Sequence, residues 1–188
     1  MMFNELTKNI KMLLLDVDGV LTDGSIITGA QGELCKKFHV SDGLGISLAL
    51  KNGLQIGIVT GRSSDIVAVR ARELNIELVH QGVVDKKQTL KEIIEQSGYS
   101  YKEIAYMGDD LNDLGIMKSV GLAIAPANAV VEVRERVHYI CLRSGGNGAV
   151  REAVEFILKN QGKWNGIIKN FLQTQGETNA ILSDKISQ

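Results

Sequence analysis

The sequence predicts an α/β protein built on a doubly wound parallel sheet. Short apolar runs, such as residues 13–15 and 54–59, recur along the chain and indicate strands that are buried on both faces. Helical stretches separate these runs, and regular alternation of this kind is typical of a parallel sheet covered by helices. Several runs end directly in acidic or polar residues. This places those residues at the carboxyl edge of the sheet, where open α/β sheets bind ligands.

The elements can be assigned in order along the chain. Strands are expected at residues 13–15, 54–59, 76–81, 104–107, 121–124 and 138–142. Ser41 and Asp42 are expected to cap the first intervening helix, which glycine stops at residues 52–53. Trp164 begins a late amphipathic stretch with apolar residues at steps of three and four.

Length and composition favour one soluble domain, expected at residues 1–174, followed by a polar tail at 175–188. The net charge is −1 and no long basic run occurs, so neither a nucleic acid nor a membrane is an expected partner. The N-terminus does not resemble a signal peptide. Cys35 and Cys141 are expected to be free thiols in a reducing compartment, which indicates a cytoplasmic protein.

A β-hairpin is predicted soon after the first strand, within an insertion at about residues 24–40. Its two arms, residues 25–28 and 34–40, flank the turn-forming sequence Gly-Ala-Gln-Gly. Such an insertion would project from the active edge of the sheet. Because an isolated hairpin is only marginally stable in water, we expect it to pack on another subunit.

Four strand or helix ends carry groups that suit phosphate chemistry. They are the pair Asp16 and Asp18, then Thr60, then Lys86, and finally Asp109 with Asp110 and Asp113. In a parallel sheet these groups would converge on one cleft. Clustered carboxylates suit a hard cation, and Mg²⁺ is the usual choice where phosphate is handled. A hydroxyl and an ammonium facing the acids would bind phosphoryl oxygens.

The hydrolysis of a phosphate monoester explains why these residue types are needed. The uncatalysed reaction is among the slowest known, because the dianion repels nucleophiles. A carboxylate, already ionised near neutral pH, can attack phosphorus and split the reaction into two easier steps. A cation offsets the repulsion, and a second carboxyl group protonates the leaving alkoxide and later deprotonates water.

The four segments resemble the four motifs of the haloacid dehalogenase superfamily, in the same order. The matching segments are residues 16–20 (Asp-Val-Asp-Gly-Val), residues 59–61 (Val-Thr-Gly), Lys86, and residues 108–113 (Gly-Asp-Asp-Leu-Asn-Asp). The resemblance implies a Rossmann-like fold of this superfamily and a reaction through an aspartyl-phosphate.

The resemblance also implies a role for each residue. Asp16 would be the nucleophile and a metal ligand, and Asp18 the general acid/base, which also lends its backbone carbonyl to the metal. Thr60 and Lys86 would hold the phosphoryl group. By the same resemblance, Asp109 would ligate Mg²⁺, with Asp110 and Asp113 supporting the metal site.

Further segments are similar to a capless subfamily, the phosphatases of 3-deoxy-D-manno-octulosonate 8-phosphate in lipopolysaccharide sugar biosynthesis. They are the hairpin in place of a cap domain, residues 21–24, residues 81–82 and residues 145–152. This similarity implies a homotetramer assembled through the hairpins. It also implies that a neighbouring subunit completes each site and that the C-terminal tail is able to close over it.

The candidate substrate-binding residues are Gly61, Arg62 and Arg70. A related phosphatase of a nine-carbon keto-deoxy sugar acid 9-phosphate carries glutamate at the position of Arg62 and lysine at that of Glu73. Arg62 therefore favours the octulosonate, whose carboxylate a guanidinium can pair with bidentately. Arg70 either lines the same mouth or is a solvated charge on its helix.

Two other classes of protein compete with a phosphatase. One is a non-catalytic assembly domain, of the kind fused to sialate-activating enzymes. The other is a receiver-type signalling domain, which also gathers Asp, Thr and Lys around Mg²⁺. Receivers have no acid two residues after the phosphorylated aspartate, whereas this chain has Asp18, so turnover is favoured.

Overall fold

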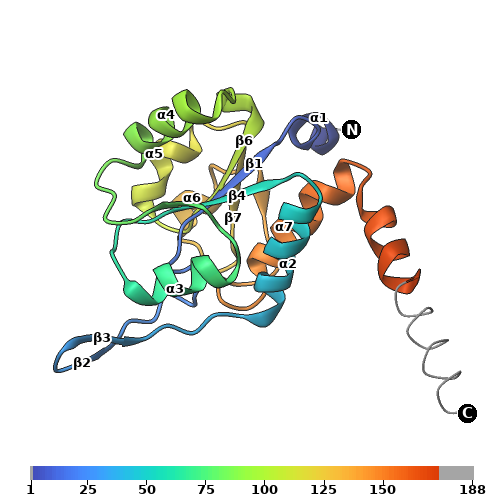
Figure 1. Cartoon of the computed structure of the whole chain (residues 1–188). Helices are drawn as coiled ribbons and strands as arrows, with labels where there is room; N and C mark the ends of the chain where they lie inside the picture. The colour runs from blue at the N-terminus through green and yellow to red at the C-terminus, as the bar shows by residue number, and fades with distance from the viewer. Residues whose placement is uncertain (1, 174–188) are drawn as a thin grey trace, which may run out of the picture.

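The computed structural model describes residues 2–173 and centres on a six-stranded sheet (Figure 1). The strand order is β5-β4-β1-β6-β7-β8, and every neighbouring pair is parallel. The strands are β1 (Met12–Leu15), β4 (Gln55–Val59), β5 (Leu78–His80), β6 (Ile104–Met107), β7 (Leu122–Ala125) and β8 (Tyr139–Ile140). The predicted doubly wound α/β fold and its six strands are confirmed.

The direction of winding reverses at β1. From β1 the chain adds β4 and β5 on one side of the sheet, and then crosses over to add β6, β7 and β8 on the other. At such a reversal the loops that follow neighbouring strands diverge and leave a crevice for a ligand. Asp16, which directly follows β1, therefore lies at the mouth of this crevice.

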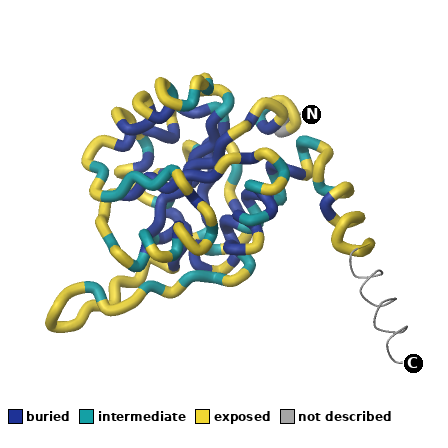
Figure 2. The backbone as a smooth tube through the Cα atoms, viewed as in Figure 1, coloured by how far each residue is buried: buried dark blue, intermediate teal, exposed yellow. Residues whose placement is uncertain are grey.

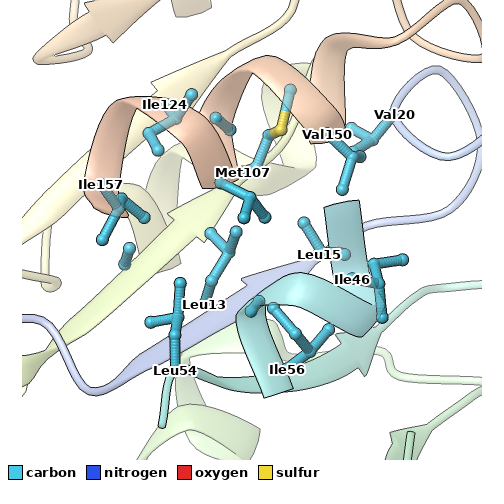
Figure 3. Close-up of a cluster of buried hydrophobic side chains, with 14 of the residues drawn as sticks. Leu13, Leu15, Val20, Ile46, Leu54, Ile56, Met107, Ile124, Val150 and Ile157 are labelled. Carbon is cyan, nitrogen blue, oxygen red and sulfur yellow. The ribbon is translucent and has the colours of Figure 1, made fainter. Parts of the chain in front are cut away.

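Both faces of the sheet are buried, which explains the uninterrupted leucine run. Leu13 and Leu15 belong to one apolar cluster, with Ile46 and Ile157 from the covering helices (Figure 3). Leu14 belongs to the cluster on the opposite face, and all of β1 is buried (Figure 2). The first face is covered by α2 (Val40–Lys51), α3 (Asp65–Glu73) and α7 (Ala149–Asn160), and the second by α4 (Lys86–Ser97), α5 (Leu114–Met117) and α6 (Val131–Arg134).

The predicted capping of α2 by Ser41 and Asp42 is wrong. His39 is the N-cap, and its Nδ1 accepts a hydrogen bond from the backbone N–H of Ser41. Asp42 lies in the first turn and accepts instead from the N–H groups of Gly148 and Arg151 at the start of α7. Asp42 thus caps a neighbouring helix and joins α2 to α7.

The predicted hairpin is present as β2 (Ile27–Gly29) and β3 (Gly32–Cys35), which pair antiparallel and project from the body (Figures 1 and 2). A short helix that the sequence analysis did not anticipate, α1 (Met2–Thr7), precedes β1. The late amphipathic stretch is helical at residues 164–173. The predicted tail, residues 175–188, lies outside the described residues.

Two short 3-10 helices, η1 (Tyr101–Glu103) and η2 (Leu111–Asp113), flank β6. Across residues 2–173, no helix combines the length and the apolar character that crossing a membrane demands.

Candidate active site

A pocket of about 410 Å³ opens at the carboxyl edge of the sheet, beside the end of β1. Its position follows from the fold, because β1, β4 and β6 all end there. Its wall brings together residues from every strand end that the sequence analysis singled out, with Lys86 buried close by. The lining residues are Asp16, Asp18, Gly24, Thr60, Gly61, Arg62, Asp109, Asp110, Leu111 and Asn112.

Lys86 lies at the centre of a buried polar cluster. Its Nζ is 2.5 Å from Oδ2 of Asp16 and 2.6 Å from Oδ1 of Asp113. The hydroxyl of Tyr106 donates to the same Asp113 oxygen at 2.7 Å and lies 3.1 Å from Nζ. The first turn of α4 supplies Lys86, and the side chain of Asp85 caps that turn. One ammonium group is therefore shared between two carboxylates.

The surroundings favour the charged form of Lys86 and disfavour the charged forms of Asp16 and Asp109. Burial lowers the pKa of Lys86, but the carboxylates of Asp16 and Asp113 outweigh this effect and raise it. Burial raises the pKa of Asp16 despite the adjacent ammonium, and the Asp113 charge adds to this rise. Burial, reinforced by the charges of Asp113 and Asp16, raises the pKa of Asp109 to about 7.

These acids fit a divalent cation. Carboxylate oxygens of Asp16, Asp109 and Asp113 lie within 4.8 Å of one another. Three carboxylates against the single ammonium of Lys86 leave two negative charges, which one divalent cation would neutralise. Hard oxygen ligands of this kind suit Mg²⁺.

Asp113 differs from the other two acids because it is fully buried, is not among the described residues that line the pocket, and has two donors on each carboxylate oxygen. One oxygen binds Lys86 and Tyr106, and the other accepts from the N–H groups of Asp109 and Asp110 at 2.9 and 3.2 Å. Asp16 and Asp109 are therefore the better direct ligands, and Asp113 holds them in place. Asp110 lines the pocket and caps η2 through its bond from the N–H of Leu111.

The side chain of Asp18 has its ion-pair partners outside this cluster. Its Oδ1 lies 2.5 Å from Nζ of Lys36, on the hairpin, and its Oδ2 lies 3.5 Å from Nε of Arg62. Arg62 lines the pocket with its side chain about half exposed. A metal contact through the backbone carbonyl of Asp18 stays a prediction.

Thr60 and Gly61 lie on the pocket wall, but Arg70 is not among the residues of the described chain that line it. The guanidinium of Arg70 binds Glu73 at 2.8 Å and stacks 5.5 Å from the ring centroid of Phe38. The Arg70 side chain is 19% exposed, and a contact between Arg70 and the substrate stays a prediction.

Sequence reasoning missed Tyr106 and Asn128. A tyrosine within a fully buried strand needs a polar partner for its hydroxyl, and this signal could have directed attention to Tyr106. Asn128 donates to the carbonyl of Gly19 at 3.0 Å and accepts from the N–H of Gly145 at 2.6 Å. It joins segments more than 100 residues apart, so no local pattern marks it.

Glycine is required at two places beside the pocket because other groups approach closely. A Cβ at Gly19 would lie 2.0 Å from Oδ2 of Asp109, and the φ of Gly19 is +81°. A Cβ at Gly145 would lie 1.8 Å from the carbonyl oxygen of Gly19. The glycine-rich turn at residues 144–148 thus packs directly on the loop that follows β1.

Comparison with known proteins agrees with this geometry. A family profile described as haloacid dehalogenase-like hydrolase matches residues 63–154. The Escherichia coli K12 protein named 3-deoxy-D-manno-octulosonate 8-phosphate phosphatase KdsC is 41% identical over 156 residues, which cover 83% of each chain.

Solved structures show the same similarity. One of them is the Moraxella catarrhalis 3-deoxy-D-manno-octulosonate 8-phosphate phosphatase in complex with magnesium ion, phosphate ion and KDO. It has a TM-score of 0.88 and 40% identity, and the match covers 90% of this chain and 98% of that chain. The cobalt-bound Haemophilus influenzae enzyme has a TM-score of 0.82 and 39% identity, with 84% of this chain and 92% of that chain covered.

The fold, the acidic cluster and the profile match together define a haloacid dehalogenase-like hydrolase. Within that class, the chain belongs to the family of 3-deoxy-D-manno-octulosonate 8-phosphate phosphatases. The predicted superfamily, fold and enzyme class are therefore confirmed.

Proposed function

We propose that the protein hydrolyses 3-deoxy-D-manno-octulosonate 8-phosphate to the free sugar acid and inorganic phosphate, with Mg²⁺ as cofactor. The observation that carries this proposal is the arrangement around Lys86. A buried ammonium holds Asp16 at the end of β1, with Asp109 close enough to share a divalent cation with it. The relatives named for this activity, one of them with magnesium, phosphate and KDO bound, support the same conclusion.

In the first step, a carboxylate oxygen of Asp16 attacks phosphorus and the bond between phosphorus and the C8 oxygen of the sugar breaks. Asp18 donates its proton to the departing alkoxide. In the second step, water attacks phosphorus in the aspartyl-phosphate while Asp18 takes the proton back. The bond to Asp16 then breaks, which releases phosphate and restores the Asp16 carboxylate and the protonated Asp18.

The other residues hold the phosphoryl group and the cation. Thr60 and Lys86 would donate hydrogen bonds to phosphoryl oxygens. Asp16 and Asp109 would hold the metal, with the backbone carbonyl of Asp18, while Asp110 and Asp113 would support it. Magnesium, when bound, offsets the repulsion between the phosphate dianion and the attacking carboxylate.

Arg62 supports the choice of substrate. Its guanidinium lies on the pocket wall, about half exposed, where it could pair with the carboxylate of a keto-deoxy sugar acid. Arg70, ion-paired to Glu73, is a weaker candidate for the same task.

The experiment is a phosphate-release screen with and without Mg²⁺. The substrates are the eight-carbon octulosonate 8-phosphate, the nine-carbon 9-phosphate, and common hexose phosphates. We expect Mg²⁺-dependent release with the highest kcat/KM for the octulosonate. A higher kcat/KM for the nine-carbon acid or for a hexose phosphate would contradict the proposed substrate, and an absence of release from every ester would favour an assembly domain.

We further propose that residues 1–174 act as one domain in a cytoplasmic homotetramer that serves lipopolysaccharide sugar biosynthesis. The projecting hairpin supports the assembly, since Ile27 and Leu34 are exposed apolar side chains on its two strands. In this assembly the neighbouring subunit and the tail at residues 175–188 would complete the site.

A further inference from the structure

A closed ring of alternating charges joins the hairpin to the pocket. Asp18 contacts Lys36 at 2.5 Å, Lys36 contacts Glu33 at 3.0 Å, Glu33 contacts Arg62 at 3.9 Å, and Arg62 returns to Asp18 at 3.5 Å. Ser64 adds a hydrogen bond to Glu33. The ring therefore links three segments: the loop after β1, the second hairpin strand β3 and its continuation, and the loop after β4.

Lys36 is the most buried member of this ring. Its side chain is only 2% exposed, although the surrounding hairpin is largely exposed. Burying an ammonium is costly unless it is paired, so this lysine is held by the two carboxylates of Asp18 and Glu33. Lys36 is not among the described residues that line the pocket, and Asp18 is the pocket residue that it contacts directly.

We propose that Lys36 is a positioning residue that sets the orientation of the Asp18 carboxylate, and that the hairpin thereby takes part in the reaction. This inference rests on the general acid/base role assigned to Asp18 under the proposed function. Because Lys36 directly follows β3, the placement of the hairpin sets the placement of the ammonium group. Glu33 fixes Lys36 from the other side and is itself fixed by Ser64 and Arg62.

The consequence for the reaction depends on whether the leaving group must be protonated as it departs. A basic alkoxide leaves only with a proton from a well-placed acid, whereas 4-nitrophenolate leaves without one. If Lys36 orients Asp18, its loss should slow the first step for an alkyl phosphate and spare the first step for 4-nitrophenyl phosphate. A merely structural defect would slow both.

The test compares the full chain with Lys36→Met, Lys36→Arg and the control Lys37→Met. Methionine keeps the apolar stem of the lysine but removes its charge, and Lys37 is the exposed neighbour. Single-turnover release of alcohol is measured, in Mg²⁺, from ethyl phosphate and from 4-nitrophenyl phosphate. Thermal unfolding of each variant is measured in parallel.

We expect Lys36→Met to slow release from ethyl phosphate about tenfold or more, since general acid catalysis contributes roughly 10²–10⁴-fold, and to leave release from 4-nitrophenyl phosphate within about twofold. Lys36→Arg should recover part of the loss, and Lys37→Met should resemble the parent chain. Equal slowing with both esters, or no slowing with either, would overturn the inference.

These esters do not depend on the identity of the natural substrate. Failure to hydrolyse the octulosonate ester would count against the proposed function, whereas the ratio between the two generic esters decides the role of Lys36.

Discussion

At the scale of single residues, the sharing of Lys86 between Asp16 and Asp113 dominates the site. Replacing Lys86 with methionine would leave two buried carboxylates without their common cation. We expect the free energy of unfolding of the metal-free protein to fall by about 3–5 kcal/mol. We also expect phosphate release to fall at least about 100-fold, because a donor to the transferring group is lost.

Lys87→Met is the matched control for this change, since Lys87 is the exposed neighbour on the same turn. Denaturant unfolding and phosphate release measure the two effects. A Lys86→Met protein as stable and as active as the control would contradict both roles assigned to Lys86.

The pKa of Asp109, raised to about 7, predicts a pH-dependent effect of magnesium. A raised carboxyl pKa favours the folded, metal-free protein below about pH 4, and this contribution is lost as pH rises through 7. A cation takes the deprotonated form, so its stabilising effect grows over the same window. The rise in Tm on adding Mg²⁺, relative to chelator, should therefore be larger at pH 8 than at pH 6.

Thermal unfolding at both pH values, with and without Mg²⁺, measures this difference. Asparagine does not titrate between pH 6 and pH 8, so Asp109→Asn should make the rise in Tm on adding Mg²⁺ more nearly equal at the two pH values. A magnesium effect that is the same at pH 6 and pH 8 would contradict the assignment of Asp109.

At the scale of elements, Asp42 joins two helices that are distant in sequence. Its carboxylate accepts from two N–H groups at the start of α7 although it lies in α2. We expect Asp42→Ala to lower the free energy of unfolding by about 1–2 kcal/mol, the usual cost of losing a helix cap. Asp65→Ala, in the exposed first turn of α3, should cost less.

Urea unfolding of the two variants measures the comparison. If Asp42→Ala lowered the free energy of unfolding no more than Asp65→Ala, the cap that Asp42 provides to α7 would not stabilise the protein.

The strands could be predicted because burial on both faces leaves a plain apolar run, as at residues 13–15 and 104–107. The motif residues could be predicted to meet because parallel strands end at one edge, and the pocket does gather Asp16, Thr60 and Asp109. The contacts that could not be predicted join residues distant in the sequence. The partner of Asp42 is at residue 148, and no spacing within α2 indicates it.

The ring at the base of the hairpin was missed for the same reason. Lys36 in a strand-like segment has the pattern of a solvated charge, and only the folded hairpin brings it to Asp18. Arg70 likewise has contacts that its position in the sequence does not indicate, because its side chain pairs along the helix with Glu73 and stacks on Phe38.

At the scale of the whole molecule, the projecting hairpin leaves apolar side chains in water unless subunits associate. We expect the double change Ile27→Glu and Leu34→Glu to convert the proposed tetramer to smaller species, because like charges would then meet at the interface. Sedimentation velocity measures the change. Val131→Glu, an exposed apolar position on α6, is the control and should leave the assembly unaltered.

A parent protein that is monomeric across the concentration range would contradict the proposed assembly. So would a double variant that sediments like the parent.

The central claim is that Asp16 takes the phosphoryl group. The most direct measurement is mass spectrometry of the protein after acid quench during turnover with Mg²⁺ and a phosphate ester. We predict one added phosphoryl group on the peptide that contains Asp16. A folded Asp16→Asn variant should show neither the added phosphoryl group nor turnover. A phosphoryl group on a different residue, or undiminished turnover by Asp16→Asn, would contradict the mechanism.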